Sequence, residues 1–142
     1  MMEPDEYSPT KLRSVWCKPA QFARKVEDEL YRSRRYDVSV CLVFVNFPMT
    51  FSHKAAREVA AFVGRGLRRL DFAGVVGDGD YAICLPHTDR DGTGAVVSRL
   101  LLLTASFPIR IGVASHPEDG ATFGELVATA KRRAELRLGI AA

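Results

Sequence analysis

The sequence lacks the features of a membrane-spanning, disulfide-bonded or metal-binding protein. No apolar run approaches the roughly 20 residues that a membrane-spanning helix needs. Cysteine occurs only three times, an odd number without metal-ligand spacing, so neither a disulfide framework nor a zinc site is expected. His53, His87 and His116 share no ligand spacing either. The opening residues, MMEPDEYSPTK, are too acidic and polar for a secretory signal, and we expect a cytoplasmic protein.

An excess of charge of one sign is also missing. The net charge of +3, from 20 Lys and Arg against 17 Asp and Glu, is too small to indicate a nucleic-acid partner. Aromatic residues make up only 9% of the chain, and no aromatic-rich basic signature is seen. Apolar residues, in contrast, make up 47% of the 142 residues, which is enough for one domain with a single core.

The hydrophobic pattern predicts helices and strands after a flexible lead over residues 1–15. Pro19 suits a first helical turn because its φ is fixed, and Phe22, Val26 and Leu30 then recur every four residues. The expected helices cover residues 19–34, 52–70, 89–104 and a last segment capped by Thr122 and Glu125, and the expected strands cover 38–47, 73–77, 80–86 and 108–115.

This element order predicts a single α+β domain over residues 16–142. A hairpin flanked by two crossover helices gives a ferredoxin-like βαββαβ core, with a mostly antiparallel central sheet flanked by helices. The strand at 38–47 is apolar almost throughout, which is typical of a central strand. Asp78 and Gly79 at the hairpin tip suit a type I′ turn, because both residue types tolerate positive φ.

Three segments make the chain resemble the GGDEF domain of diguanylate cyclases, bacterial enzymes that join two GTP molecules into cyclic di-GMP. The segments are FARKVEDELYRSRRYDVSVCLVFVNF, LRRLDFAGVVGDGDYAICLPHTD and IRIGVASHPEDGATFGELVATAK. The last is the most specific, because its Ile-Gly-Val-Ala and Pro-Glu-Asp-Gly pieces keep the family's spacing. The resemblance covers roughly residues 10–138 and implies the nucleotide-cyclase type of the ferredoxin-like core.

The family's signature, Gly-Gly-Asp(or Glu)-Glu-Phe, falls on a degenerate hairpin: Gly77, Asp78, Gly79, Asp80 and Tyr81. The resemblance implies that a metal-binding, catalytic carboxylate is missing at Gly79, and that Asp80 keeps the next charge on a shorter side chain. Asp78 replaces a glycine that lets substrate approach the backbone, and its charge would repel phosphate.

Three further departures from the family fall outside the hairpin. Asn46 stands where the first strand of the family ends in an aspartate, and Leu138 where a lysine meets the triphosphate. The guanine-reading segment is shortened to PMTFSHKAAREVAA, with His53 in place of an aspartate. We therefore expect no catalytic residue, metal or cofactor, and a chain that is not an enzyme. A residual cyclase, with Asp78 and Asp80 as metal ligands, is the minor alternative.

A second family site has counterparts here. The family's product-inhibition motif, Arg-x-x-Asp, matches Arg68 and Asp71, six residues before the signature, and Arg99 falls at the spacing of a second arginine. Arginine forks bind phosphate and guanine acceptor edges, and residues 68 and 71 are expected one helical turn apart on a shared face. The trio predicts binding of cyclic di-GMP. The pattern is common, however, since Arg34 and Asp37 also match it, and such a pair can be a solvated ion pair.

We therefore expect a degenerate GGDEF domain that binds cyclic di-GMP and passes the signal to an unidentified protein partner. Ligand-induced homodimerisation is a corollary. The alternative is a ligand-free protein-protein interaction scaffold, and neither a nucleic acid nor a membrane is an expected partner. Two basic clusters are interpreted as solvated helix faces: Arg65/Arg68/Arg69 and Lys131/Arg132/Arg133.

Overall fold

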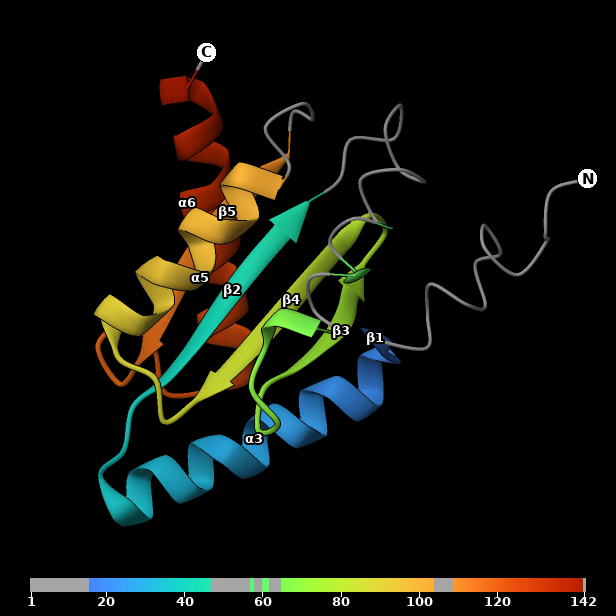
Figure 1. Cartoon of the computed structure of the whole chain (residues 1–142). Helices are drawn as coiled ribbons and strands as arrows, with labels where there is room; N and C mark the ends of the chain where they lie inside the picture. Colours follow the sequence, from blue (N-terminus) through green and yellow to red (C-terminus); the bar gives the residue numbers. More distant parts are fainter. Residues whose placement is uncertain (1–15, 47–56, 58–59, 62–64, 104–108, 142) are drawn as a thin grey trace, which may run out of the picture.

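The fold is described from a computed structural model, which covers residues 16–46, 57, 60–61, 65–103 and 109–141 (Figure 1). The expected lead over 1–15 lies outside these residues. The elements are β1 (Trp16–Cys17), α3 (Pro19–Tyr36), β2 (Val40–Asn46), β3 (Phe72–Gly77), β4 (Asp80–Pro86), α5 (Arg90–Leu103), β5 (Arg110–His116) and α6 (Phe123–Ala141). Each of them except β1 was expected from the hydrophobic pattern, within about two residues at each end.

The helix expected over 52–70 is wrong at its end. Arg65 and Gly66 are helical, but the chain bends at Leu67 and turns through Arg69 and Leu70. Glycine is a poor helix former, and Gly66 is the last helical residue before the bend. Leu70, the last residue of the expected helix, is exposed.

The sheet has the strand order β1-β3-β4-β2-β5. β4 pairs antiparallel with both β2 and β3, and β5 pairs antiparallel with β2. The predicted α+β class and mostly antiparallel ferredoxin-like sheet are therefore confirmed. Only β1 is parallel to its neighbour, β3; with two residues, it is too short to show a strand period in the sequence.

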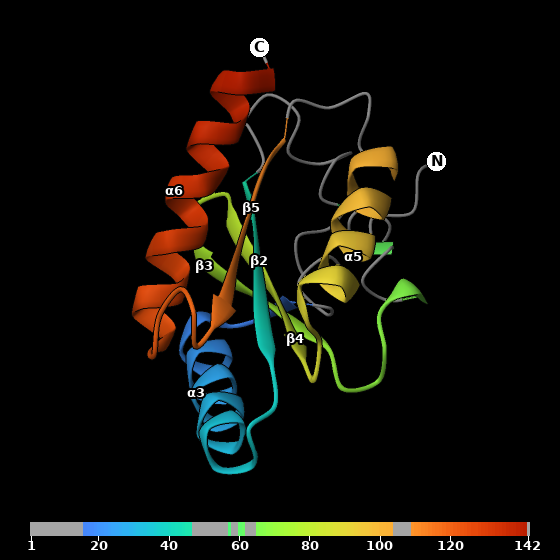
Figure 2. The ribbon, with the colours of Figure 1, turned by 90° about the vertical axis from the view of Figure 1, so that its left-hand side faces the viewer.

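Helices cover both faces of the sheet, with α3 and α6 on one face and α5 on the other (Figure 2). Side chains of β2 alternate between the two faces, and every position of the strand before Asn46 is buried. Cys41, Val43 and Val45 pack on the α5 side, where Leu100 is fully buried. A central strand covered on both faces explains the unbroken apolar run in the sequence.

The α3–α6 layer is packed closely against the sheet. A Cβ added at Gly74 would lie 2.4 Å from Cγ of Phe22, the first buried residue of α3. Two hydrogen bonds join α3 to the start of α6 and the turn before it: Glu27 Oε2 accepts from the Phe123 amide at 2.9 Å, and Arg34 donates to the Ala121 carbonyl at 3.0 Å. The start of α6 is thus fixed by side chains of α3.

Two smaller expectations are also met. Thr122 Oγ1 accepts from the Glu125 amide at 3.2 Å, as expected for a helix cap. All three cysteines are free thiols. Within the described residues, no helix is both long and apolar enough to cross a bilayer.

Candidate functional site

The hairpin between β3 and β4 lies at the upper end of the sheet in Figure 1. Its tip is Asp78-Gly79, as expected, but the type I′ turn is wrong. Gly79 has a φ of 71°, whereas Asp78 is not in the positive-φ region. The pairing also shifts by one residue between Val75 and Gly77. Such a bulge adds local strand twist, so the hairpin can close without two successive residues at positive φ.

The Asp80 carboxylate at the base of this hairpin is already bound by protein groups. Asn46 Nδ2 donates to Asp80 Oδ1 at 2.6 Å and to the Gly79 carbonyl at 3.3 Å. On the other side, the Lys131 ammonium lies 3.7 Å from Asp80 Oδ2. Three elements, β2, β4 and α6, thus meet at one carboxylate and offset its charge.

These residues do not fit the pair of magnesium ions implied by the family resemblance. Magnesium prefers several oxygen ligands, usually including carboxylates, but Asp80 is the only carboxylate among the four contacting residues Asn46, Gly79, Asp80 and Lys131. A divalent ion would also be repelled by the Lys131 ammonium. Among the described residues, no three His, Cys, Asp or Glu side chains are grouped as metal ligands.

Arg68 and Asp71 lie at the other end of β3, about 20 Å away at the usual rise per strand residue. They do not share a helical face as expected, because both belong to the turn before β3. Asp71 Oδ2 accepts from the Arg68 amide at 2.9 Å, and the Asp71 amide donates to the Arg68 carbonyl at 3.0 Å. The guanidinium reaches Asp71 Oδ1 at 3.3 Å. The motif therefore closes a four-residue turn.

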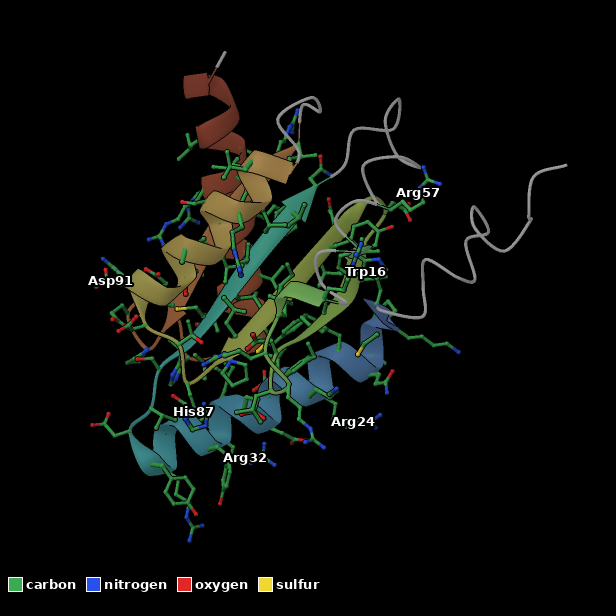
Figure 3. All side chains as sticks on the ribbon, in the orientation of Figure 1. Trp16, Arg24, Arg32, Arg57, His87 and Asp91 are labelled. Atoms are coloured by element: carbon green, nitrogen blue, oxygen red, sulfur yellow. The ribbon has the colours of Figure 1, made fainter. Side chains whose placement is uncertain are left out.

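The Arg68 guanidinium also ties this turn to the end of β4. It donates to the Pro86 carbonyl at 2.6 Å and to the Thr88 hydroxyl. Arg68 and Thr88 line a pocket of about 420 Å³, together with Val38, Ser39, His87, Asp89 and Gly92. The exposed His87, labelled in Figure 3, has a φ of 54°, which suits a sharp change of direction after the strand. The pocket thus lies between the β4 end and the start of α5.

Arg99 lies close to the same turn. Its Nη1 donates to the carbonyl of Gly66, two residues before Arg68, at 3.5 Å. The Arg99 guanidinium of α5 therefore lies beside the segment that leads into the turn of Arg68 and Asp71, although Asp71 and Arg99 are 28 residues apart in the sequence. The side chains differ in access: Arg68 is 54% exposed, whereas the Asp71 side chain is only 3% exposed. The Arg68 side chain is therefore accessible to solvent, and the buried Asp71 carboxylate orients it.

Two contacts of the last helix were not anticipated in the sequence. Lys131 and Arg133 were interpreted as parts of a solvated face, but Lys131 contacts Asp80, and Arg133 forms a two-pronged ion pair with Asp119 at 2.8 Å. The Arg133 hydrogen bond lowers the pKa of Asp119, and the backbone amide of Ser115 lowers it further. Ion pairs between residues so far apart in sequence leave no local pattern.

A buried polar pair at the end of β5 also escaped detection. The hydroxyl of Ser33 donates to the Val38 carbonyl, and His116 Nδ1 lies 3.0 Å from the same hydroxyl oxygen. Since that hydroxyl proton is used, the contact fits an Nδ1–H donor. Burial lowers the pKa of His116, and the nearby Arg34 lowers it further. The pair joins α3 to β5 and takes no part in the candidate site.

A scan of the sequence against protein-family models found no match, and no curated protein matches it either. Solved structures do match. A sensory box/GGDEF family protein from Caulobacter crescentus is 17% identical, with a TM-score of 0.72 over 89% of this chain and 95% of that one. The diguanylate cyclase SiaD of Pseudomonas aeruginosa, solved with its activator SiaC, is 20% identical, with a TM-score of 0.75 over 96% of this chain and 60% of that one.

A third solved structure contains a nucleotide. The GGDEF domain of DgcB from Caulobacter crescentus, in complex with c-di-GMP, is 15% identical, with a TM-score of 0.66 over 89% of this chain and 82% of that one. At these identities the likeness concerns the fold. The chain has the α+β fold of the GGDEF domains, with its sheet flanked by helices.

Proposed function

We propose that the chain is a non-catalytic, cytoplasmic GGDEF-type domain that binds cyclic di-GMP and signals through a protein partner. The observation that carries the proposal is the grouping of Arg68 and Arg99 at one turn, far along β3 from a hairpin whose Asp80 is already bound. A preserved ligand site beside a lost active site is what a receptor needs.

The hairpin supports the non-catalytic half of the proposal. Metal-assisted phosphoryl transfer needs ions held by carboxylates close to the triphosphate. In this chain the third signature position is Gly79, and Asp80 is held by Asn46 and Lys131 instead. An amide and an ammonium therefore occupy the place where the family resemblance implies metal ligation.

The Arg68 turn supports the ligand half. Two guanidinium groups within reach of one turn provide donors for phosphate oxygens and for the acceptor edge of guanine. In this proposal the Asp71 carboxylate positions Arg68, because it accepts hydrogen bonds from the Arg68 amide and guanidinium. The c-di-GMP complex of the DgcB domain is consistent with a ligand of this class on this fold.

Calorimetry with cyclic di-GMP tests this proposal. We expect wild type to bind, and Arg68→Ala and Arg99→Ala to weaken binding by about ten- to a hundredfold, since each loses a charge-assisted hydrogen bond. Arg132→Ala is the matched control, because it removes the same charge from an exposed position on α6. No heat from wild type at tens of micromolar protein would rule out the receptor.

Two further measurements complete the test. Incubation with GTP and magnesium should yield no cyclic di-GMP by chromatography, and any turnover would contradict the non-catalytic assignment. Light scattering should show two copies joined upon addition of cyclic di-GMP, as the family resemblance implies. An unchanged molecular mass with ligand bound would contradict ligand-induced dimerisation but not the binding of cyclic di-GMP.

The ligand-free scaffold remains the second candidate, and the burial of Asp71 favours it. Its carboxylate is 3% exposed and bonded to Arg68, which itself is tied to Pro86 and Thr88. These contacts would also exist in a purely structural turn. A ligand that binds only the folded state must raise the melting temperature, so no shift with cyclic di-GMP would favour the scaffold.

A further inference from the structure

A groove lies between α5 and the free edge of the sheet. β5 is the last strand in the sheet order, so among the described residues one of its long sides has no strand beside it. The groove has a volume of about 460 Å³, within the range of ligand sites. It begins near Arg90, one residue before the Asp91 labelled in Figure 3 at the left-hand end of α5.

The groove has an apolar floor. Val97 and Leu101 of α5 line it together with Val113 of β5, and Leu101 is 45% exposed. Gly94 widens it, because a Cβ there would meet nothing within 4 Å. From Arg90 to Leu101 the lining residues follow one stripe of the helix, about 16 Å long. An extended chain of about five residues has this length.

The charges at the rim favour a carboxylate. Arg90, Arg133 and Asp119 are the ionised residues that line the groove, and Arg133 engages both oxygens of Asp119. Arg90 is exposed, and its positive charge, together with that of Arg133, helps to lower the pKa of Asp119. Arg90, Arg133 and Asp119 together carry one net positive charge, which lies beside the apolar floor of the groove.

A second copy of the chain is not the expected occupant. Its edge strand would have to pair with outward backbone groups of β5, which alternate along the strand. The Val113 carbonyl already accepts from Arg133 at 2.9 Å, and the Ser115 amide donates to Asp119 at 2.8 Å. The Ser115 carbonyl accepts from the Asp119 amide. This part of the edge cannot extend a ladder, so an occupant must dock through its side chains.

We propose that this groove binds an extended peptide segment of a partner protein, with apolar side chains on Val97, Leu101 and Val113 and an acidic side chain on Arg90. The site supplies the partner surface that the proposed function calls for and rests on that function for its role in signalling. The test of the groove uses no nucleotide, so a failure of peptide binding and a failure of cyclic di-GMP binding can be told apart.

The probe is a phage-displayed library of random heptapeptides, panned on the purified chain, with selected peptides remade and measured by fluorescence polarisation. We expect selected sequences to combine Asp or Glu with Leu, Ile or Phe. Gly94→Phe, which fills the groove, and Arg90→Glu should each weaken binding by at least about tenfold. Ser98→Trp is a second blocking variant if Gly94→Phe does not fold.

Matched controls separate the groove from general effects. Gly124→Phe places the same ring at an exposed glycine of α6 whose Cβ position is also open, and Arg132→Glu makes the same charge change on that helix. Both should bind as wild type does. A library that yields no binder, binders that tolerate every groove variant, or binders rich in Lys and Arg would each overturn the proposal.

Discussion

The side-chain amide of Asn46 donates a 2.6 Å hydrogen bond to the Asp80 carboxylate, across the neighbouring strands β2 and β4. The two residues are direct partners in the antiparallel register. An aspartate at position 46 would place two carboxylates face to face, and like charges in that position are destabilising unless a cation joins them. The neutral amide and the Lys131 ammonium let the hairpin close without a metal.

The first prediction concerns divalent ions. Manganese or magnesium should leave the melting temperature of wild type unchanged, because Lys131 offsets the charge of Asp80. The double variant Asn46→Asp with Lys131→Ala provides two carboxylates without the ammonium, so manganese should raise its melting temperature by a few degrees. Lys131→Ala alone is the control and should show no rise. Stabilisation of wild type by manganese would contradict this account.

The second prediction concerns the packing of α6 on β5. A Cβ at Gly112 would lie 1.9 Å from the Ala130 carbonyl oxygen and 2.6 Å from the Ala134 amide nitrogen. Gly112→Ala should therefore lower the free energy of unfolding by about 3 kcal/mol or more, measured in urea. Gly94→Ala, in an open helical position, should raise it by about 0.5–1 kcal/mol. Equal stability of the two variants would be incompatible with this packing.

The third prediction concerns acid stability at Asp119. Its pKa is lowered mainly by the hydrogen bond from Arg133, so the folded state holds the carboxylate in its charged form. That contribution is present above the unfolded-state pKa of about 3.9 and is lost as the pH falls through the folded pKa. Asp119→Asn should lower stability near neutral pH and reduce the loss below about pH 4. If the stability of wild type and of Asp119→Asn changed with pH in the same way, the pairing of Asp119 with Arg133 would be contradicted.

The fourth prediction concerns His116. Its pKa is lowered by burial and by Arg34, with Glu118 acting in the opposite direction. The folded state therefore favours the neutral ring, and stability should fall as the pH drops below the unfolded-state value of about 6.5. His116→Asn, which retains a donor toward Ser33, should remove this step from the pH profile. His87→Asn is the control, because His87 is exposed and asparagine tolerates its positive φ.

The strands other than β1 were predictable because each carries a local signal. The apolar run before Asn46 identifies a strand buried on both faces, and the Asp78-Gly79 tip identifies the hairpin, so element order alone defines the sheet. The turn type was not predictable. A bulge near Val76 supplies the twist that two positive-φ residues would otherwise provide, and bulges leave no sequence pattern here.

The ligand-binding role of Arg68, Asp71 and Arg99 stays a prediction from the sequence, and the geometry of the Arg68 turn was not predicted. The spacing of Arg68 and Asp71 suggested a shared helical face, because nothing in the apolar repeat signals the bend at Leu67. The bonds from Arg68 to Pro86 and Thr88, and from Lys131 to Asp80, depend on how distant elements meet. Such contacts follow from tertiary packing, which the spacing of charges along the chain does not encode.

The bonds between α3 and the start of α6 connect distant parts of the domain. Glu27 accepts from the Phe123 amide, and Arg34 donates to the Ala121 carbonyl, so α3 is bonded to the first residue of α6 and to the turn before it. Lys131 lies about 12 Å further along the same rigid helix and contacts Asp80 of the hairpin. The ion pair of Lys131 with Asp80 thus connects the hairpin to a helix whose first residue is bonded to α3.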